Sequence, residues 1–140
     1  MKIKGWDKLR YKFVTMGGAM LAIDTTWSDD NQYDGTTSYY LTICDADNVG
    51  ETLISVKLKE GVMDEFYLTA NLEQPQITPN INRVFRKNDM ENVDVFLRIV
   101  CEELMRNAMV NSFITLLAEV QMKRNNTNTF SSHSFGVNKW

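Results

Sequence analysis

Few residues in this chain could do chemistry, and their spacing does not form a catalytic group. His133 is the only histidine, so a Ser-His-Asp or Cys-His arrangement would depend on that one residue. Cys44 and Cys101 with one histidine lack the spacing of a zinc site. We expect two free thiols rather than a disulfide. The sequence therefore predicts no enzymatic activity and no cofactor.

Two acidic stretches, residues 28–38 and 45–50, contain the oxygen ligands that calcium prefers. Read as an EF-hand loop from Asp30, the first stretch has Leu41 at the twelfth position, where a bidentate glutamate is required. The second stretch has Val49 at its fifth position. Both are better explained as turns stabilised by Asp and Asn side chains, and we expect no metal site.

A basic cluster at the N-terminus is the strongest candidate for a binding surface. In an extended strand, Lys8, Arg10 and Lys12 share one face and could follow a phosphate backbone. Trp6 lies close enough in the chain to stack on a base. The candidate contacts to single-stranded nucleic acid are Lys2, Lys4, Trp6, Lys8, Arg10 and Lys12.

The distribution of charge favours another use of this cluster. Residues 1–12 carry +4 and residues 123–140 carry +3, whereas the whole chain carries −3, so the body between them carries −10. Basic ends and an acidic body suit contact between neighbouring copies. We therefore predict Lys8, Arg10 and Lys12 as subunit contacts. Protection of an edge strand by lysines and nucleic-acid binding are the alternatives.

Alternating residues after the basic cluster predict a β-hairpin. The pair Gly17-Gly18 can take the positive φ values of its turn, with Tyr11 and Phe13 facing the core. A helix over residues 6–16 is the alternative. In the second strand the alternating positions are Leu21, Ile23, Thr25 and Trp27.

The hairpin begins an antiparallel β-meander with one apolar face. A loop at residues 28–38 follows it, and short turn-rich links join the later strands. Pro75 and Pro79 should end the sheet within residues 73–88. The five predicted strands cover residues 8–16, 19–27, 39–44, 52–59 and 65–72.

Residues 89–122 have the periodicity of helical structure. Asn88 followed by Glu91 resembles a capping box at its start. The predicted buried stripe is Val93, Leu97, Val100, Leu104 and Ala108. The predicted exposed charge ladder is Asp94, Arg98, Glu102 and Arg106.

From residue 109 to residue 120 apolar side chains occur almost all round the predicted helix. Such a helix must be covered on every side, and a single sheet covers only one. Either the helix breaks near residues 107–111, giving a helical hairpin, or a second chain covers the rest.

The chain thus reads as one α+β domain over residues 1–122 and a polar C-terminal arm over residues 123–140. A segment this polar gains little from burial within its own chain. We expect Phe130, Phe135 and Trp140 to anchor the arm on a neighbouring chain.

We predict a non-enzymatic structural protein that works through protein–protein contacts in a larger complex, as a homo-oligomer or with other assembly proteins. A virion, as in a phage head–tail component, is one setting. The alternatives are a single-stranded nucleic-acid-binding protein and a small inhibitor or adaptor of a host protein. Without a secretory signal or a membrane span, we expect cytoplasmic synthesis, no membrane contact and no small-molecule substrate.

Overall fold

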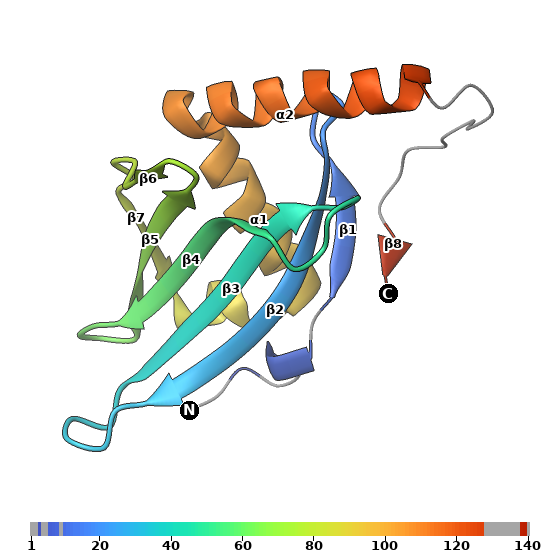
Figure 1. Ribbon diagram of the computed structural model, residues 1–140. Coiled ribbons are helices and arrows are strands. Elements are labelled where there is room, and N and C mark those ends of the chain that lie inside the picture. The colour runs from blue at the N-terminus through green and yellow to red at the C-terminus, as the bar shows by residue number, and fades with distance from the viewer. Residues whose placement is uncertain (1–2, 4–5, 9, 128–137, 140) are drawn as a thin grey trace.

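The computed structural model describes residues 3, 6–8, 10–127 and 138–139. Its strands form one antiparallel sheet in the order β6-β5-β4-β3-β2-β1-β8, with β7 also paired to β5, and two helices follow β7 in the chain (Figure 1). This confirms the predicted α+β class. The strands are β1 (Tyr11–Val14), β2 (Met20–Asp30), β3 (Thr37–Asp45), β4 (Thr52–Glu60), β5 (Glu65–Glu73), β6 (Gln76–Ile77), β7 (Arg83–Arg86) and β8 (Asn138–Lys139); the helices are α1 (Val93–Arg106) and α2 (Ala108–Thr127), with short 3-10 helices η1 (Trp6–Lys8) and η2 (Lys87–Met90).

The N-terminal hairpin confirms the strand interpretation. β1 pairs with β2, with Val14 opposite Met20. In the turn Gly18 has a φ of 90°, which glycine adopts without steric cost. The alternative helix over residues 6–16 is wrong, because η1 ends at Lys8 and residues 11–14 form β1.

β2 and β3 are longer than predicted because their hairpin loop spans only residues 31–36. Asp29 and Asp30, which we expected in a loop, pair with Ser38 and Thr37 across the hairpin. β2 therefore continues to Asp30 and β3 begins at Thr37, so the sheet includes side chains that we expected in a loop.

An extra residue in β2 reverses the face that its later residues occupy. The register with β3 shifts between Ile23 and Thr25, with Asp24 between them. Since side chains alternate with a period of two, one extra residue moves all later ones to the other face. Trp27, whose spacing placed it with Leu21 and Ile23, therefore lies on the opposite face of the sheet.

The sheet also continues past the prolines, so the prediction that residues 73–88 end it is wrong. β6 and β7 pair along the edge of β5 away from β4. Phe85 of β7 lies opposite Phe66 and is fully buried. β6 and β7 join the sheet because they pair with β5. The positions of the prolines in the sequence do not predict this long-range pairing.

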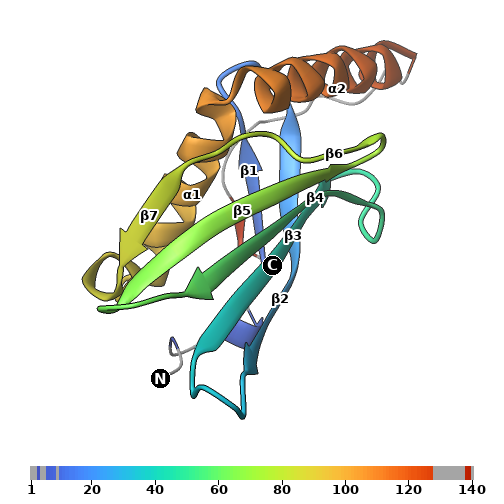
Figure 2. The ribbon, with the colours of Figure 1, turned by 90° about the vertical axis from the view of Figure 1, so that its left-hand side faces the viewer.

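The hydrophobic core lies between α1 and one face of the twisted sheet, and Val110, Ile114 and Ala118 of α2 belong to it as well (Figures 1 and 2). We call this face of the sheet the inner face. Neither helix covers the outer face of β2, β3 and β4 in these views, and on this face a small cluster of Ala22, Cys44 and Ala46 is buried near the loop that follows β3. The largest fully buried side chains include Trp6, Tyr39, Phe85, Phe96, Leu21, Ile23, Leu41, Ile43, Ile54 and Leu58.

α1 begins later than predicted. Its N-cap is Asn92, whose side-chain oxygen accepts a hydrogen bond from the Val95 amide at 3.2 Å. The predicted capping box of Asn88 and Glu91 is wrong, because Asn88 lies in η2 and Glu91 directly follows it. Asparagine at the N-cap satisfies an amide that the helix leaves unpaired.

The two faces of α1 follow the predicted pattern. Leu97, Val100 and Leu104 are buried against the sheet, and Val93 is half-buried. Ala108 is exposed and belongs to α2, so it is not part of the buried stripe. The exposed charge ladder is Asp94, Arg98, Glu102 and Arg106.

The helical region is two helices, as the predicted break near residues 107–111 allows. Asn107 has an extended backbone with a ψ of 125°, which ends α1. Its side-chain oxygen accepts hydrogen bonds from the amides of Met109 at 3.0 Å and Val110 at 3.1 Å. One asparagine therefore ends α1 and caps the start of α2.

Hydrogen bonds fasten the C-terminal half of α2 to the ends of β2 and β3. The buried Gln121 amide accepts from the Met20 amide at 2.7 Å and donates to the Met20 carbonyl and to the Asp45 carboxylate, both at 2.8 Å. Arg124 donates to the other Asp45 oxygen at 2.8 Å. These bonds hold α2 across one end of the sheet (Figure 1).

The described part of the C-terminal arm contacts its own chain through Arg124 of α2 and through β8. α2 runs to Thr127, beyond the predicted domain end at residue 122. In β8, Asn138 pairs with Lys12 and Lys139 pairs with Tyr11. At these positions the arm extends its own sheet.

Candidate functional site

The predicted basic strand face does not form, because its members lie on different elements. Lys8 is in η1, Arg10 lies between η1 and β1, and only Lys12 belongs to β1. Lys2 and Lys4 lie outside the described residues. The prediction assumed one extended strand from residue 8, and η1 interrupts it.

Arg10 has partners within its own chain. Its guanidinium donates to the backbone carbonyl of Asp24 and lies 3.6 Å from the Asp24 carboxylate. Lys12 is half-buried and pairs with Ala22 along the hairpin. Part of the basic charge is thus compensated intramolecularly. That Lys8, Arg10 and Lys12 contact another subunit stays a prediction.

Trp6 is a core residue, so the expectation that it stacks on a base is wrong. Its side chain is 1% exposed and packs edge-on against Tyr39, with ring centroids 5.4 Å apart. The indole N–H donates to the backbone carbonyls of Trp27 at 2.8 Å and Tyr40 at 3.2 Å. Trp6 therefore fixes the backbones of β2 and β3 at two residues whose side chains are on the outer face.

Exposed aromatic side chains lie instead on the outer face, where sequence reasoning missed them. Trp27, Tyr40 and Lys57 are in register across β2, β3 and β4, and we call them the outer row. The rings of Trp27 and Tyr40 stack with centroids 5.0 Å apart and planes 6° apart, and Lys57 Nζ lies 5.6 Å from the Tyr40 centroid. Trp27 is 41% exposed. The irregularity at Asp24 concealed this row, since strict alternation assigns Trp27 to the core.

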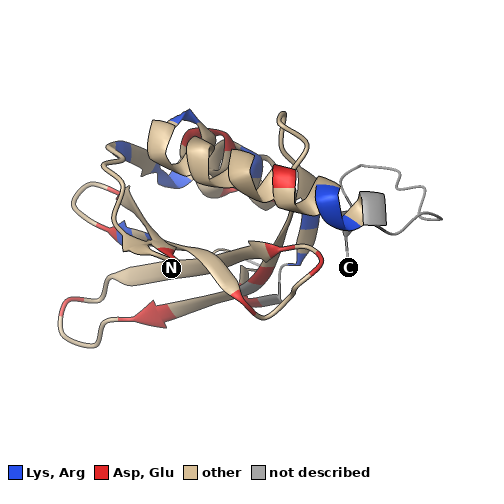
Figure 3. Ribbon diagram, turned by 45° about the horizontal axis from the view of Figure 1, so that its top comes forward, with Lys and Arg blue, Asp and Glu red and all other residues tan. Residues whose placement is uncertain are grey.

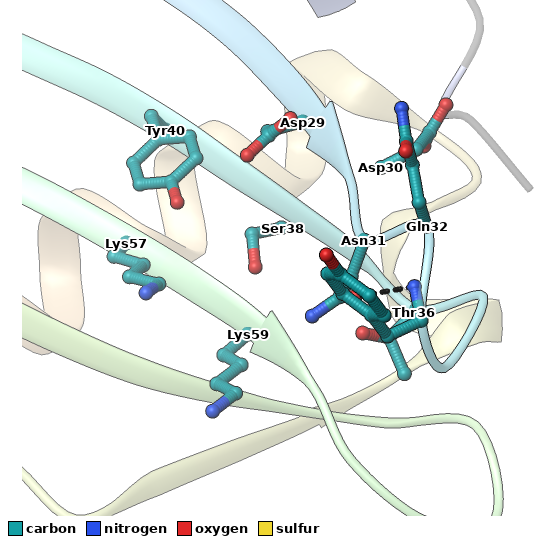
Figure 4. A pocket seen from close by; sticks show the side chains of 10 residues that line it. Asp29, Asp30, Asn31, Gln32, Thr36, Ser38, Tyr40, Lys57 and Lys59 are labelled. Carbon is teal, nitrogen blue, oxygen red and sulfur yellow. Dashed lines mark hydrogen bonds between the residues drawn. The ribbon is translucent and has the colours of Figure 1, made fainter.

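A polar pocket of about 420 Å³ opens beside the outer row (Figure 4). A second register row two residues further along the strands, formed by Asp29, Ser38 and Lys59, supplies part of its lining. The loop at residues 31–36 forms the rim. The lining of the pocket includes two carboxylates, two lysine ammonium groups, and amide and hydroxyl groups. The lining residues are Asp29, Asp30, Asn31, Gln32, Tyr33, Thr36, Ser38, Tyr40, Lys57 and Lys59.

Within the two acidic stretches, residues 31–36 and 45–47 form the predicted Asp- and Asn-stabilised turns, whereas residues 28–30 and 37–38 are in strands. Asn31 Oδ1 accepts from the Tyr33 amide at 2.8 Å, and the Asp34 carboxylate accepts from the Thr36 amide at 2.9 Å. The bonds from Thr36 lower the pKa of Asp34. In the turn after β3, the Asp45 carboxylate accepts a hydrogen bond of the same kind from the Asp47 amide. Within the described residues, no group of three or more potential metal ligands is found.

Both cysteines are free thiols, as predicted. Desolvation raises the pKa of Cys101 to about 12 and also raises the pKa of Cys44. A nucleophilic cysteine has a lowered pKa, so neither thiol has the environment of a reactive one.

One side of α2 is apolar and uncovered. Val110, Ile114 and Ala118 are buried toward the domain. On the other side Leu116 is 62% exposed and Val120 is 47% exposed. We name the outer seam by its members: Met109, Leu116 and Val120, which are exposed, and Phe113, which is half-buried at the boundary with the core. Charge on α2 is confined to its C-terminal half (Figure 3).

The predicted arm anchors Phe130, Phe135 and Trp140, and His133 with them, lie outside the described residues. Their contact with a neighbouring chain stays a prediction.

Comparison with protein-family models, with curated proteins and with solved structures finds no match for this chain. Neither α1 nor α2, the two α-helices in the described part of the chain, has the length and hydropathy of a membrane-spanning segment.

Proposed function

We propose that this protein is a non-enzymatic subunit of a larger assembly and works through contacts with other protein chains. The outer seam of α2 carries the proposal. Three of its four large apolar side chains are exposed, namely Met109, Leu116 and Val120, and Phe113 is half-buried between them and the core. Contiguous exposed apolar surface is typical of protein interaction sites.

The spacing of the outer seam favours a second helix as its occupant. Its four residues follow one another at intervals of four, three and four, which is the spacing of a coiled-coil seam. A second copy of the chain presents the same seam on its own α2. Such a pair would be isologous, with the same patch on both copies. Each large side chain fully buried there would contribute about 1.5–3 kcal/mol.

The other predicted roles have less support. For nucleic acid at the N-terminus, Trp6 is buried and Arg10 is paired with Asp24. An inhibitor or adaptor would present the same seam to a helix of another protein. The virion setting stays a prediction from the sequence.

Light scattering coupled to size-exclusion chromatography tests the proposal on the full chain. We expect a dimer or larger species at micromolar concentration, and a monomer after Leu116→Glu, because the charge would be buried in the seam. Thr115→Glu is the matched control, since Thr115 is an exposed neighbour on α2 outside the seam. Circular dichroism reports whether each variant keeps its fold.

The salt dependence separates two modes of assembly. An apolar seam should hold at high ionic strength, whereas contacts through Lys8, Arg10 and Lys12 should weaken. A wild-type monomer at every concentration, or an oligomer indifferent to Leu116→Glu, would count against the seam.

A further inference from the structure

We propose that the outer face of the sheet binds a neutral carbohydrate, with Trp27 as the stacking surface and the adjoining pocket as the hydrogen-bonding part of the site. This inference is independent of the assembly role. It also departs from the sequence-based expectation that the protein has no small-molecule ligand.

The exposed indole is the first observation. Trp27 stacks on Tyr40, and Lys57 lies over that ring, so the row has a cross-strand stabilising role. Yet 41% of Trp27 remains exposed on a sheet face that neither helix covers. A large aromatic surface beside a pocket is typical of binding sites, because it offers apolar area at little cost in conformational entropy.

The arrangement of the two rows is the second observation. The row of Asp29, Ser38 and Lys59 runs parallel to the outer row, two residues along the strands, which is a separation of about 6.8 Å. The two stacked rings of the outer row therefore lie beside a row of hydroxyl, carboxylate and ammonium groups. A sugar ring has the matching chemistry, because its C–H face packs on an aromatic ring while its hydroxyls point to the rim.

The charge of the pocket decides between ligand classes. Its two carboxylates, Asp29 and Asp30, balance its two lysines, Lys57 and Lys59, so the lining has no net formal charge. Channels for single-stranded nucleic acid combine stacking residues with net positive charge, because each phosphate must be compensated. A neutral polyol needs both donors and acceptors, and this lining supplies both.

The site is held in shape by hydrogen bonds from the core and by hydrogen bonds within its rim. The Trp6 indole N–H fixes the backbone carbonyls of Trp27 and Tyr40 from within the domain. In the rim, the Asn31 amide donates to the Thr36 carbonyl at 2.8 Å, and the Gly35 amide donates to the Asn31 carbonyl at 2.9 Å. Preorganisation of this kind lowers the entropic cost of binding.

The test uses the full chain and neutral tetrasaccharides of glucose, N-acetylglucosamine, mannose and galactose as probes. Tryptophan fluorescence and ligand-observed NMR report binding. We expect at least one probe to bind, and Trp27→Ala to weaken it by about tenfold or more, as for an aromatic anchor. Lys59→Ala should also weaken it, and this exposed residue can be changed without disturbing the core.

Lys87→Ala is the matched control, because Lys87 lies in η2 and does not line the pocket. It should bind like the wild type. No binding of any probe at millimolar concentration would overturn the proposal, as would binding that is indifferent to both pocket variants. An oligothymidylate that binds with steep salt dependence through Trp27, where the sugars fail, would assign the face to nucleic acid instead.

Discussion

At the end of β3, the buried Asp45 carboxylate accepts hydrogen bonds from Gln121, Arg124 and the Asp47 amide. Burial alone would raise the pKa of Asp45, but the bond from Arg124 and the two amide bonds outweigh it, and the pKa is lowered. A pKa lower in the folded than in the unfolded state stabilises the fold above the unfolded value, about 3.9. That stabilisation is lost as the pH falls through the folded-state pKa.

We predict that Asp45→Asn lowers the free energy of unfolding by about 1–3 kcal/mol at neutral pH, because it removes the charge that Arg124 faces. The difference from the wild type should shrink as the pH falls below about 4. Urea denaturation over this pH range measures both effects. Asp47→Asn is the control: its exposed carboxylate lies 3.7 Å from Arg124 and should contribute less than about 0.5 kcal/mol. A difference that stays constant with pH would contradict the lowered pKa of Asp45.

Among the elements, α1 has one face that packs in the core and an opposite face that is exposed to solvent. Leu104 is fully buried in the core, while Arg98 is exposed on the charge ladder of the same helix. Substitutions at these two positions should therefore change the free energy of unfolding by very different amounts, although both positions are in the same helix.

We predict that Leu104→Ala lowers the free energy of unfolding by about 2–5 kcal/mol, because it removes buried methyl groups and leaves a cavity. Arg98→Ala should change it by less than about 0.5 kcal/mol. Chemical denaturation of both variants measures the pair. Equal costs would mean that α1 presents a different face to the sheet.

For the whole molecule, α2 and β8 tie the C-terminal part of the chain to the sheet in unequal ways. α2 uses buried hydrogen bonds from Gln121 and an ion pair from Arg124. β8 adds only two paired residues to β1. A truncation that removes Arg124 therefore breaks the ion pair with Asp45, whereas a truncation after α2 keeps it.

We predict that deleting residues 128–140 leaves the unfolding temperature nearly unchanged, whereas deleting residues 124–140 lowers it, because the longer deletion removes Arg124, the charged partner of Asp45. Thermal unfolding followed by circular dichroism distinguishes them. Light scattering on the shorter truncation adds a second result. Assembly should persist if the outer seam of α2 carries it, and should be lost if Phe130, Phe135 and Trp140 anchor the arm on a neighbour. A sharp drop in unfolding temperature for the shorter truncation would make the arm an integral part of the fold.

The sequence by itself determined the features that depend on neighbouring residues. Alternation and the Gly17-Gly18 pair predicted the meander, and helical periodicity predicted the buried and exposed faces of α1. The side chain of Asn107 caps α2 only two and three residues away, so the break between the helices was also visible locally. These features follow from backbone geometry with periods of two and 3.6 residues.

Only the tertiary structure decided the candidate binding surface. The face on which Trp27 lies depends on the extra residue at Asp24, and that residue is defined only by the register of β2 against β3. The burial of Trp6 depends likewise on carbonyls 21 and 34 residues further along the chain. Both features depend on contacts between segments that are far apart in the sequence. A local pattern of residue types does not show which segments will pair, so it could not predict either feature.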